Sequence, residues 1–195
     1  MERVRNQAAP VATGKCDAGG RLPAGGNCIG AETVLYPGPH PMDPETRLVE
    51  LHLSLPPVPK PGGIYQPVVV LNLVAYVSGT GPSRTDGTFI TGRVGADLTL
   101  AEGRAAARQV GLTILAQLRA NLGSLNRVKR LVKSLGMVNA TAEFSQHPQV
   151  INGYSELMAE VFGPDAGVGA RSAVGMVSLP GNIAVEIEAI FELHA

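Results

Sequence analysis

Apolar side chains recur at steps of three and four residues between positions 99 and 123. They are Ala107, Val110, Gly111, Ile114, Leu118 and Leu122. Arg104, Arg108, Gln117 and Arg119 fall largely outside this stripe. Thr99 and Glu102 have the spacing of a capping box, and Gly123 suits the position just after a helix C-terminus. The pattern predicts an amphipathic helix from Thr99 to Leu122.

Two further stretches are predicted to be helices. Asp43 followed by Pro44 is typical of an N-cap and a first helical position, and it leads into ETRLVELHL, which must end before Pro56. HPQVINGYSELMAEVFG predicts another helix, which ends at Gly163 and Pro164 because proline cannot continue it. Between the first helix and the first strand, PPVPKPGG is expected to form a proline-stiffened connector.

Strands are predicted where apolar and polar residues alternate or β-branched residues cluster. The clearest is VEIEAIFEL, in which Glu186, Glu188 and Glu192 share one face with Ile190 while apolar residues occupy the other. QPVVVLNLVAYVSG predicts a hairpin that turns near Leu71 and Asn72. The other candidate strands are TDGTFITGRV, the segment 128–138 and RSAVGMVSL.

The predicted order after the first helix is β β β α β α β β, which indicates an α+β fold. Two helices are expected to cover one face of a mixed sheet. The other face carries the three glutamates of the last strand and needs either water or a partner.

Composition supports one folded domain and excludes several classes of protein. Of the 195 residues, 45% are apolar, which is enough to fill a single core. Sixteen basic residues balance sixteen acidic ones, so the chain lacks the positive field of a dedicated nucleic-acid-binding protein. The longest apolar run is far too short for a membrane span, and we expect a soluble, cytoplasmic protein with no membrane partner.

The first 42 residues differ in character from the remainder. Ala8 to Pro41 is rich in Gly, Pro and Ala and shows no sustained period, so residues 1–42 are expected to be a flexible extension that is dispensable for folding of a single domain, 43–195. Cys16 and Cys28 lie in this extension, where two free thiols are favoured over a small disulfide loop.

No metal site or cofactor is expected. Neither cysteine has a second Cys or a His at metal-ligand spacing, and the four histidines are scattered singly. Phosphate-loop, GxSxG, HExxH and CxxC motifs are all lacking from the sequence. What remains is a sparse set of polar residues on predicted strands, Tyr65, Ser78, Arg171 and Glu186, of which the last two also fit an ordinary cross-strand ion pair.

Several segments between Tyr65 and Leu193 resemble the RidA family, also called YjgF-like, of reactive-intermediate deaminases. They are GIYQP, VAYVSGTGP, SELMAEVFG and, most specifically, ARSAVGMVSLPGNIAVEIEAI. The spacing agrees with the family, since Tyr65 and Ser78 are thirteen positions apart and Arg171 and Glu186 are fifteen apart. Ser155 stands where many members have Asn, and Asn152 lies three residues earlier.

The resemblance implies a chorismate-mutase-like fold, a homotrimer with pockets between subunits, and hydrolysis of small enamines and imines, such as 2-aminoacrylate and 2-iminopropanoate, to 2-keto acids and ammonia without a cofactor. By the same resemblance, Arg171 would bind the substrate carboxylate and Glu186 would position the attacking water. Tyr65, Ser78 and backbone groups near Gly79 would line the pocket, with Asn152 and Ser155 as further candidates.

Two alternatives to an enzyme remain. The same pocket could serve a trimeric binding protein for small carboxylates, which needs Arg171 but not Glu186. The less favoured alternative is a ribonuclease or RNA-binding protein, drawn from the family's older labels and from RVKRLVK at 127–133. No aromatic platform accompanies these basic residues, which favours a solvated strand edge.

Overall fold

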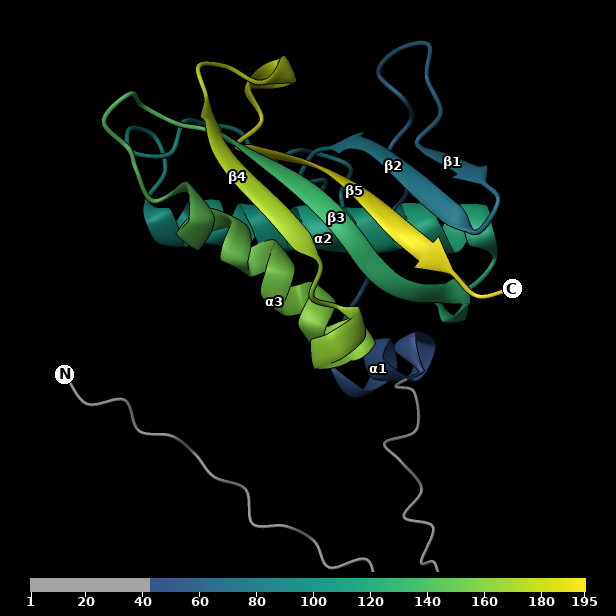
Figure 1. Cartoon of the computed structure of the whole chain (residues 1–195). Coiled ribbons are helices and arrows are strands. Elements are labelled where there is room, and N and C mark those ends of the chain that lie inside the picture. Colours follow the sequence, from purple (N-terminus) through teal and green to yellow (C-terminus); the bar gives the residue numbers. More distant parts are fainter. Residues whose placement is uncertain (1–42) are drawn as a thin grey trace, which may run out of the picture. The chain divides into compact units, whose positions relative to one another are not determined.

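The computed structural model describes residues 43–195 of the chain, and the predictions for residues 1–42, Cys16 and Cys28 among them, lie outside this part. The helices are α1 (Pro44–Glu50), α2 (Leu100–Leu122) and α3 (His147–Ala166). The strands are β1 (Val68–Leu71), β2 (Val74–Thr80), β3 (Val128–Asn139), β4 (Ala170–Met176) and β5 (Val185–Leu193). Short 3-10 turns, η1 (Leu125–Arg127) and η2 (Pro180–Asn182), precede β3 and β5 (Figure 1).

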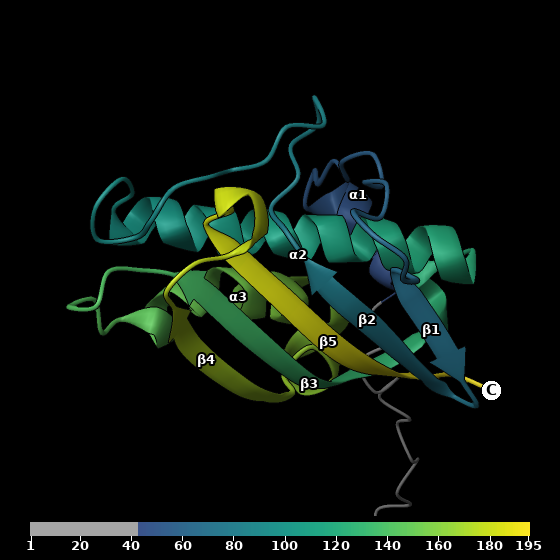
Figure 2. The same ribbon diagram turned by 90° about the horizontal axis from the view of Figure 1, so that it is seen from above.

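The five strands form one sheet in the order β1-β2-β5-β3-β4. Neighbouring strands are antiparallel except β3 and β4, which are parallel and joined by α3 as the crossover. Helix α2 contacts β2 and β5, and α3 contacts β3 and β4. The two long helices therefore cover the same face of the sheet (Figure 1 and Figure 2), which confirms the predicted α+β layer.

The core lies between this face and the two long helices. Ile187 and Phe191 of β5 are fully buried beneath α2, where Ile114 and Leu118 are also fully buried. Helices α2 and α3 approach closely at Gly111, because a Cβ there would lie 2.7 Å from a methyl carbon of Leu157. The alternating pattern of the last strand thus buries one of its faces as predicted.

The helix ends follow the local signals in the sequence. Thr99 and Glu102 make both hydrogen bonds of the capping box, and the Asp43 side chain accepts from the backbone N–H groups of α1. Helix α3 continues to Ala166, but Gly163 within it has φ 86° and ψ 165°. The regular helical geometry therefore breaks at the glycine where the sequence predicts the helix end.

The prediction of a strand in TDGTFITGRV is wrong. Residues 85–94 form a loop that makes only isolated bridges: Phe89 with Ser83, Thr91 with Ile183, and Val94 with Leu98 and with Ala140. Gly87 and Gly92 have φ values of +83° and +119°, which an extended strand does not accommodate. The sheet consequently has five strands in place of the six expected.

The second face of the sheet carries no helix within residues 43–195. Glu186 and Glu188 point to this face together with the partly exposed apolar side chains of Val69, Tyr76 and Val174. We call it the open face. No helix in the described part of the chain is long and apolar enough to cross a membrane.

Candidate functional site

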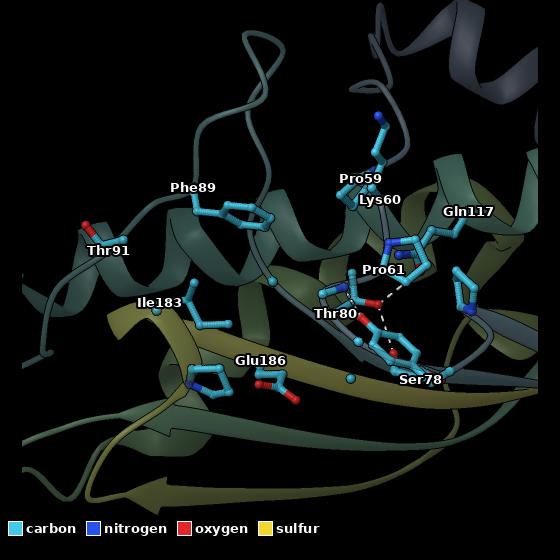
Figure 3. A pocket seen from close by; sticks show the side chains of 18 residues that line it. Pro59, Lys60, Pro61, Ser78, Thr80, Phe89, Thr91, Gln117, Ile183 and Glu186 are labelled. Atoms are coloured by element: carbon cyan, nitrogen blue, oxygen red, sulfur yellow. Dashed lines mark hydrogen bonds between the residues drawn. The ribbon is translucent and has the colours of Figure 1, made fainter.

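A pocket of about 820 Å³ lies where β2 ends beside the start of β5 (Figure 3). Its walls are the connector 59–67, the loop that carries Phe89 and Thr91, and the turn before β5. Its floor includes Ser78, Gly79, Thr80, Gln117 and Glu186. We call this cavity the Glu186 pocket.

An irregularity in the sheet creates the floor of this pocket. The pairing of β2 with β5 shifts register between Val77 and Thr80, so Ser78 and Gly79 do not follow the ladder. A Cβ on Gly79 would overlap the carboxylate of Glu186. Glycine at position 79 therefore leaves the space that the Glu186 carboxylate occupies.

Among the residues that line the pocket, Glu186 has a clearly raised pKa. Burial raises the pKa of Glu186, and the negative charge of the neighbouring Glu188 raises it further. No ion pair to Glu186 forms among residues 43–195. This carboxyl group consequently holds a proton more readily than an exposed glutamate, which suits it to exchange protons with a bound water or substrate.

Ser78 and Tyr65 fix the connector against the sheet. The Ser78 hydroxyl donates to the Gln66 carbonyl at 2.7 Å, and the Ser78 backbone N–H donates to the Pro67 carbonyl at 3.0 Å. The Tyr65 hydroxyl accepts from the Gly62 N–H at 3.3 Å, and its ring is half exposed at the pocket wall. Both predicted pocket residues thus line the cavity and also shape the segment that bounds it.

Three polar residues on the buried face of α2 hold the loop and strand end that follow Ser78. Gln109 donates to the Ser83 carbonyl, Thr113 accepts from the Ser83 N–H, and Gln117 pairs with the Thr80 hydroxyl at 3.0 Å. The prediction that Gln117 lies away from the apolar stripe is wrong, since it is 6% exposed. The four-residue spacing of the three polar side chains is the signal in the sequence that could identify them.

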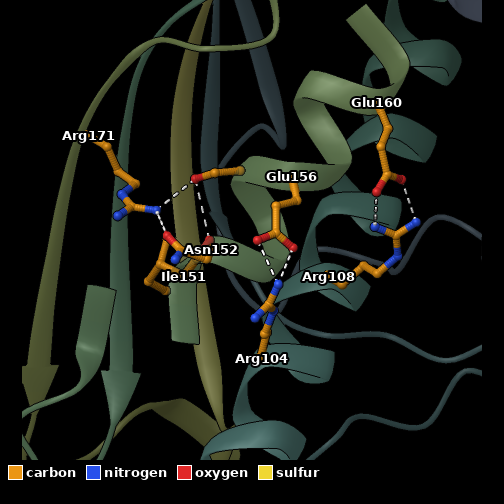
Figure 4. A network of polar contacts seen from close by, with 8 residues as sticks. Arg104, Arg108, Ile151, Asn152, Glu156, Glu160 and Arg171 are labelled. Atoms are coloured by element: carbon orange, nitrogen blue, oxygen red, sulfur yellow. Dashed lines mark hydrogen bonds and ion pairs between the residues drawn. The ribbon is translucent and has the colours of Figure 1, made fainter. Parts of the chain in front are cut away.

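Arg171 lies on β4, with its side chain on the helix-covered face (Figure 4). One terminal nitrogen, Nη1, donates to Asn152 Oδ1 and Ser155 Oγ, each at 2.9 Å. Nε and Nη2 form no hydrogen bond to the described residues, so one edge of the guanidinium stays available for a carboxylate. We call these three residues the Arg171 cluster.

Two ion pairs hold α3, which carries Asn152 and Ser155, against α2. They are Arg104 with Glu156 and Arg108 with Glu160, with closest N–O distances of 2.5 Å and 2.7 Å (Figure 4). All four side chains are partly exposed, so the pairs add little stability and serve mainly to align the two helices.

The seven predicted site residues therefore fall into two groups in one chain. Tyr65, Ser78, Gly79 and Glu186 share the Glu186 pocket, whereas Asn152, Ser155 and Arg171 form the Arg171 cluster. Arg171 and Glu186 form no ion pair, because β3 separates their strands and their side chains point to opposite faces. The interpretation of these two residues as a cross-strand pair is thus wrong within a chain.

A further residue positions the turn that forms one wall of the pocket. Asn139 is 1% exposed, and its Nδ2 donates to Asn182 Oδ1 at 3.0 Å and to the Ile183 carbonyl at 3.3 Å. Asn182 has φ 55°, in the left-handed region, within the turn that places Pro180 and Ile183 at the cavity. No motif or spacing in the sequence points to this role of Asn139. No group of three or more potential metal ligands occurs among residues 43–195.

Comparison with known proteins identifies the family of this chain. The family described as YjgF/chorismate mutase-like, putative endoribonuclease, matches residues 45–190, which is most of the chain. The chain belongs to this family. Protein TCP17 of Trypanosoma cruzi is 42% identical over 147 residues, covering 75% of this chain and 92% of that protein.

Solved structures of other proteins share this fold. Protein Atu1372 of Agrobacterium tumefaciens, described as having unknown function, is 40% identical, with a TM-score of 0.70 over 77% of this chain and 94% of that one. RidA from an Antarctic Psychrobacter species is 26% identical, with a TM-score of 0.51 over 70% of this chain and 94% of that one. The resemblance to the RidA family that the sequence predicts is confirmed.

Proposed function

We propose that this protein hydrolyses small 2-imino acids and their enamine tautomers to 2-keto acids and ammonia. The observation that carries the proposal is the carboxyl group of Glu186, half buried in an 820 Å³ pocket with a raised pKa and no cationic partner among the described residues. Such a group can accept a proton from water and return it to a leaving amine. The likeness to RidA, a relative by family, supports the same chemistry.

The reaction needs orientation more than activation. The Glu186 carboxylate takes a proton from water as the water oxygen bonds to the imine carbon, and the C=N electron pair moves to nitrogen. Glu186 then gives this proton to that nitrogen, which forms a carbinolamine. The carboxylate next takes the hydroxyl proton of the carbinolamine and passes it to the same nitrogen, so the C–N bond breaks and ammonia leaves as the carbonyl forms. Once the imine is bound beside a correctly positioned water, no additional group is needed to activate the imine carbon.

The substrate carboxylate requires a cation, and we assign this role to Arg171. Because Arg171 and Glu186 point to opposite faces of one sheet, the complete site must combine the Glu186 pocket of one copy with the Arg171 cluster of another. The exposed apolar side chains of the open face, such as Val69, Tyr76 and Val174, support assembly through this face. We propose a homotrimer, and light scattering should give the mass of three chains.

A trapping assay tests the proposed reaction. An amino-acid oxidase generates the imine in situ, and semicarbazide traps whatever imine remains. Wild-type protein should lower the semicarbazone signal, while Arg171→Ala and Glu186→Gln should not. Arg171→Lys should restore little of the activity that Arg171→Ala loses, since an ammonium group cannot reproduce the planar fork of a guanidinium. Equal trapping with wild-type protein and with buffer across several amino acids would rule out the deaminase.

The alternatives predict different results in the same experiments. A binding protein would bind a keto acid through Arg171 and still fail to lower trapping, so Glu186→Gln would leave its function intact. For RNA binding, one of the four basic side chains of the segment 127–133 is already paired with an acidic group, since Lys129 lies 2.7 Å from Glu192. Among the three, this structure favours the deaminase.

A further inference from the structure

The floor of the Glu186 pocket includes two polar side chains that the proposed reaction does not use. Gln117 lines the pocket from α2 and Thr80 from β2, at exposures of 6% and 3%. The Thr80 hydroxyl oxygen lies 3.0 Å from Gln117 Oε1 and 2.9 Å from the Ser78 carbonyl oxygen. Figure 3 shows the Gln117 side chain reaching from its helix toward these groups.

One end of the Gln117 amide remains available to a ligand. A threonine hydroxyl has one proton, so Thr80 can donate either to Gln117 Oε1 or to the Ser78 carbonyl. In the first case the Gln117 N–H groups stay unused; in the second the amide is turned, Nε2 donates to Thr80, and Oε1 stays unused. Among the described residues, the side-chain polar atoms that are fully buried and lack a hydrogen-bond partner are Asn139 Oδ1 and Tyr154 Oη. The unused end of the Gln117 amide is therefore not fully buried, and because Gln117 lines the pocket we take this end to face the cavity.

Gln117 differs from the other two polar residues on the buried face of α2 in what it contacts, because its partner Thr80 is a side-chain hydroxyl that also lines the pocket. Gln109 and Thr113 each hold the backbone of Ser83, a structural role. Gln117 is bonded at one end only, although the adjacent Leu118 is fully buried in the core. A half-paired amide in a buried position lowers stability unless a ligand or water completes it.

We infer that Gln117 selects substrates whose side chain ends in a neutral carboxamide, an inference that rests on the proposed function. A carboxamide is both donor and acceptor, so it can pair with either orientation of the Gln117 amide. A side-chain carboxylate would share the pocket with the charge of Glu186, and an aliphatic side chain would leave the amide unpaired. A pocket of about 820 Å³ has room for such a side chain beyond a three-carbon imino acid.

Asparagine and leucine have side chains of nearly the same shape, so their 2-keto acids form a matched pair of ligands. Calorimetric titration of the full chain with 2-oxosuccinamate and with 4-methyl-2-oxopentanoate measures binding without turnover. Wild-type protein should bind the carboxamide about tenfold more tightly, and Gln117→Leu should remove that preference. The ratio of imine deamination rates for asparagine and leucine should change in the same direction.

Two further variants separate selectivity from folding. Asn121 is exposed one turn further along α2 and donates to the Gln117 backbone carbonyl at 2.8 Å, so Asn121→Leu makes a similar amide-to-aliphatic change outside the pocket and should keep the preference. Gln117→Met retains the length of the side chain and should lose the preference even if Gln117→Leu proves unstable.

The outcomes distinguish the inference from the proposed function. Carboxamide preference in binding without turnover of any imine would refute the deaminase and leave the selectivity standing. Turnover with equal affinities for the two keto acids, or a preference unchanged in folded Gln117→Leu and Gln117→Met, would overturn the selectivity alone. Binding of neither keto acid would overturn both.

Discussion

Arg171 and Glu186 point to opposite faces of one sheet, on the two strands that flank β3. Arg171 is paired in register with Ser134, and Glu186 with Met137, so they also differ in position along β3. A substrate of a few atoms cannot touch both side chains in one chain. The proposed site therefore makes a specific prediction about how two inactive variants behave together.

Subunit complementation tests this arrangement. Arg171→Ala and Glu186→Gln are each expected to be inactive, because every site of the proposed homotrimer lacks one group in either variant. Unfolding and refolding an equal mixture should restore about one quarter of wild-type activity, since each intact site needs a correct residue from two independently chosen chains. The separately refolded variants, mixed afterwards without exchange, provide the control. A mixture as inactive as its components would contradict a site shared between copies.

The pH dependence of stability should report the environment of Glu186. Burial and the Glu188 charge raise the pKa of Glu186 in the folded state. A raised folded pKa gives stability that is present below the unfolded pKa and is lost as pH rises through the folded pKa. Glu186→Gln stays neutral and should therefore unfold at a higher temperature than wild type at pH 7, with the difference shrinking toward pH 4.

Thermal unfolding across this pH range is the measurement. Glu188→Gln on the same strand is the comparison variant, and it should give part of the same gain by removing a neighbouring charge. A Glu186→Gln variant that is less stable than wild type at neutral pH would mean that the carboxylate has a stabilising partner.

The fold is largely predictable from the sequence because its signals are local. Thr99 with Glu102, Asp43 with Pro44, and Gly163 mark the helix ends by their own backbone chemistry. The alternation from Val185 to Leu193, interrupted at Ile190, assigns one face of β5 to the core in the same way. Residues 85–94 mislead because their β-favouring side chains suggest a strand, whereas the glycines set the backbone of a loop.

The site is only partly predictable because it depends on nonlocal geometry. Spacing relates Arg171 to Glu186 along the chain, but it cannot reveal that β3 lies between their strands. The sequence pattern assigns Gln117 to the solvent side, since a polar residue next to an apolar stripe normally lies there. Its burial depends on Thr80, a residue 37 positions earlier that only the folded sheet brings close.

Gly79 should be required for the pocket and not for the fold. A methyl group at position 79 would overlap the Glu186 carboxylate, which must then move from its position. Gly79→Ala should therefore lower deaminase kcat/KM by about tenfold or more, with a smaller effect on thermal unfolding.

Gly62→Ala is the matched control and should retain activity. Gly62 lines the same pocket, and a Cβ at that position would have no other atom within 4 Å. Equal losses in both variants would argue against a specific contact with Glu186.

Asn139 should stabilise the turn before β5 through its two donated hydrogen bonds. In Asn139→Asp these donors are lost, and a buried carboxylate faces the oxygens of Asn182 and Ile183. We expect the free energy of unfolding at pH 7.5 to fall by about 2 kcal/mol.

Because the new carboxyl would have a raised folded pKa, the deficit should shrink at pH 5, where a protonated Asp can donate again. Urea denaturation at the two pH values measures this, with Asn182→Gly as a control that keeps the left-handed backbone and the bond to Ile183. A loss in Asn139→Asp that is the same at both pH values would contradict the role of the two donated hydrogen bonds.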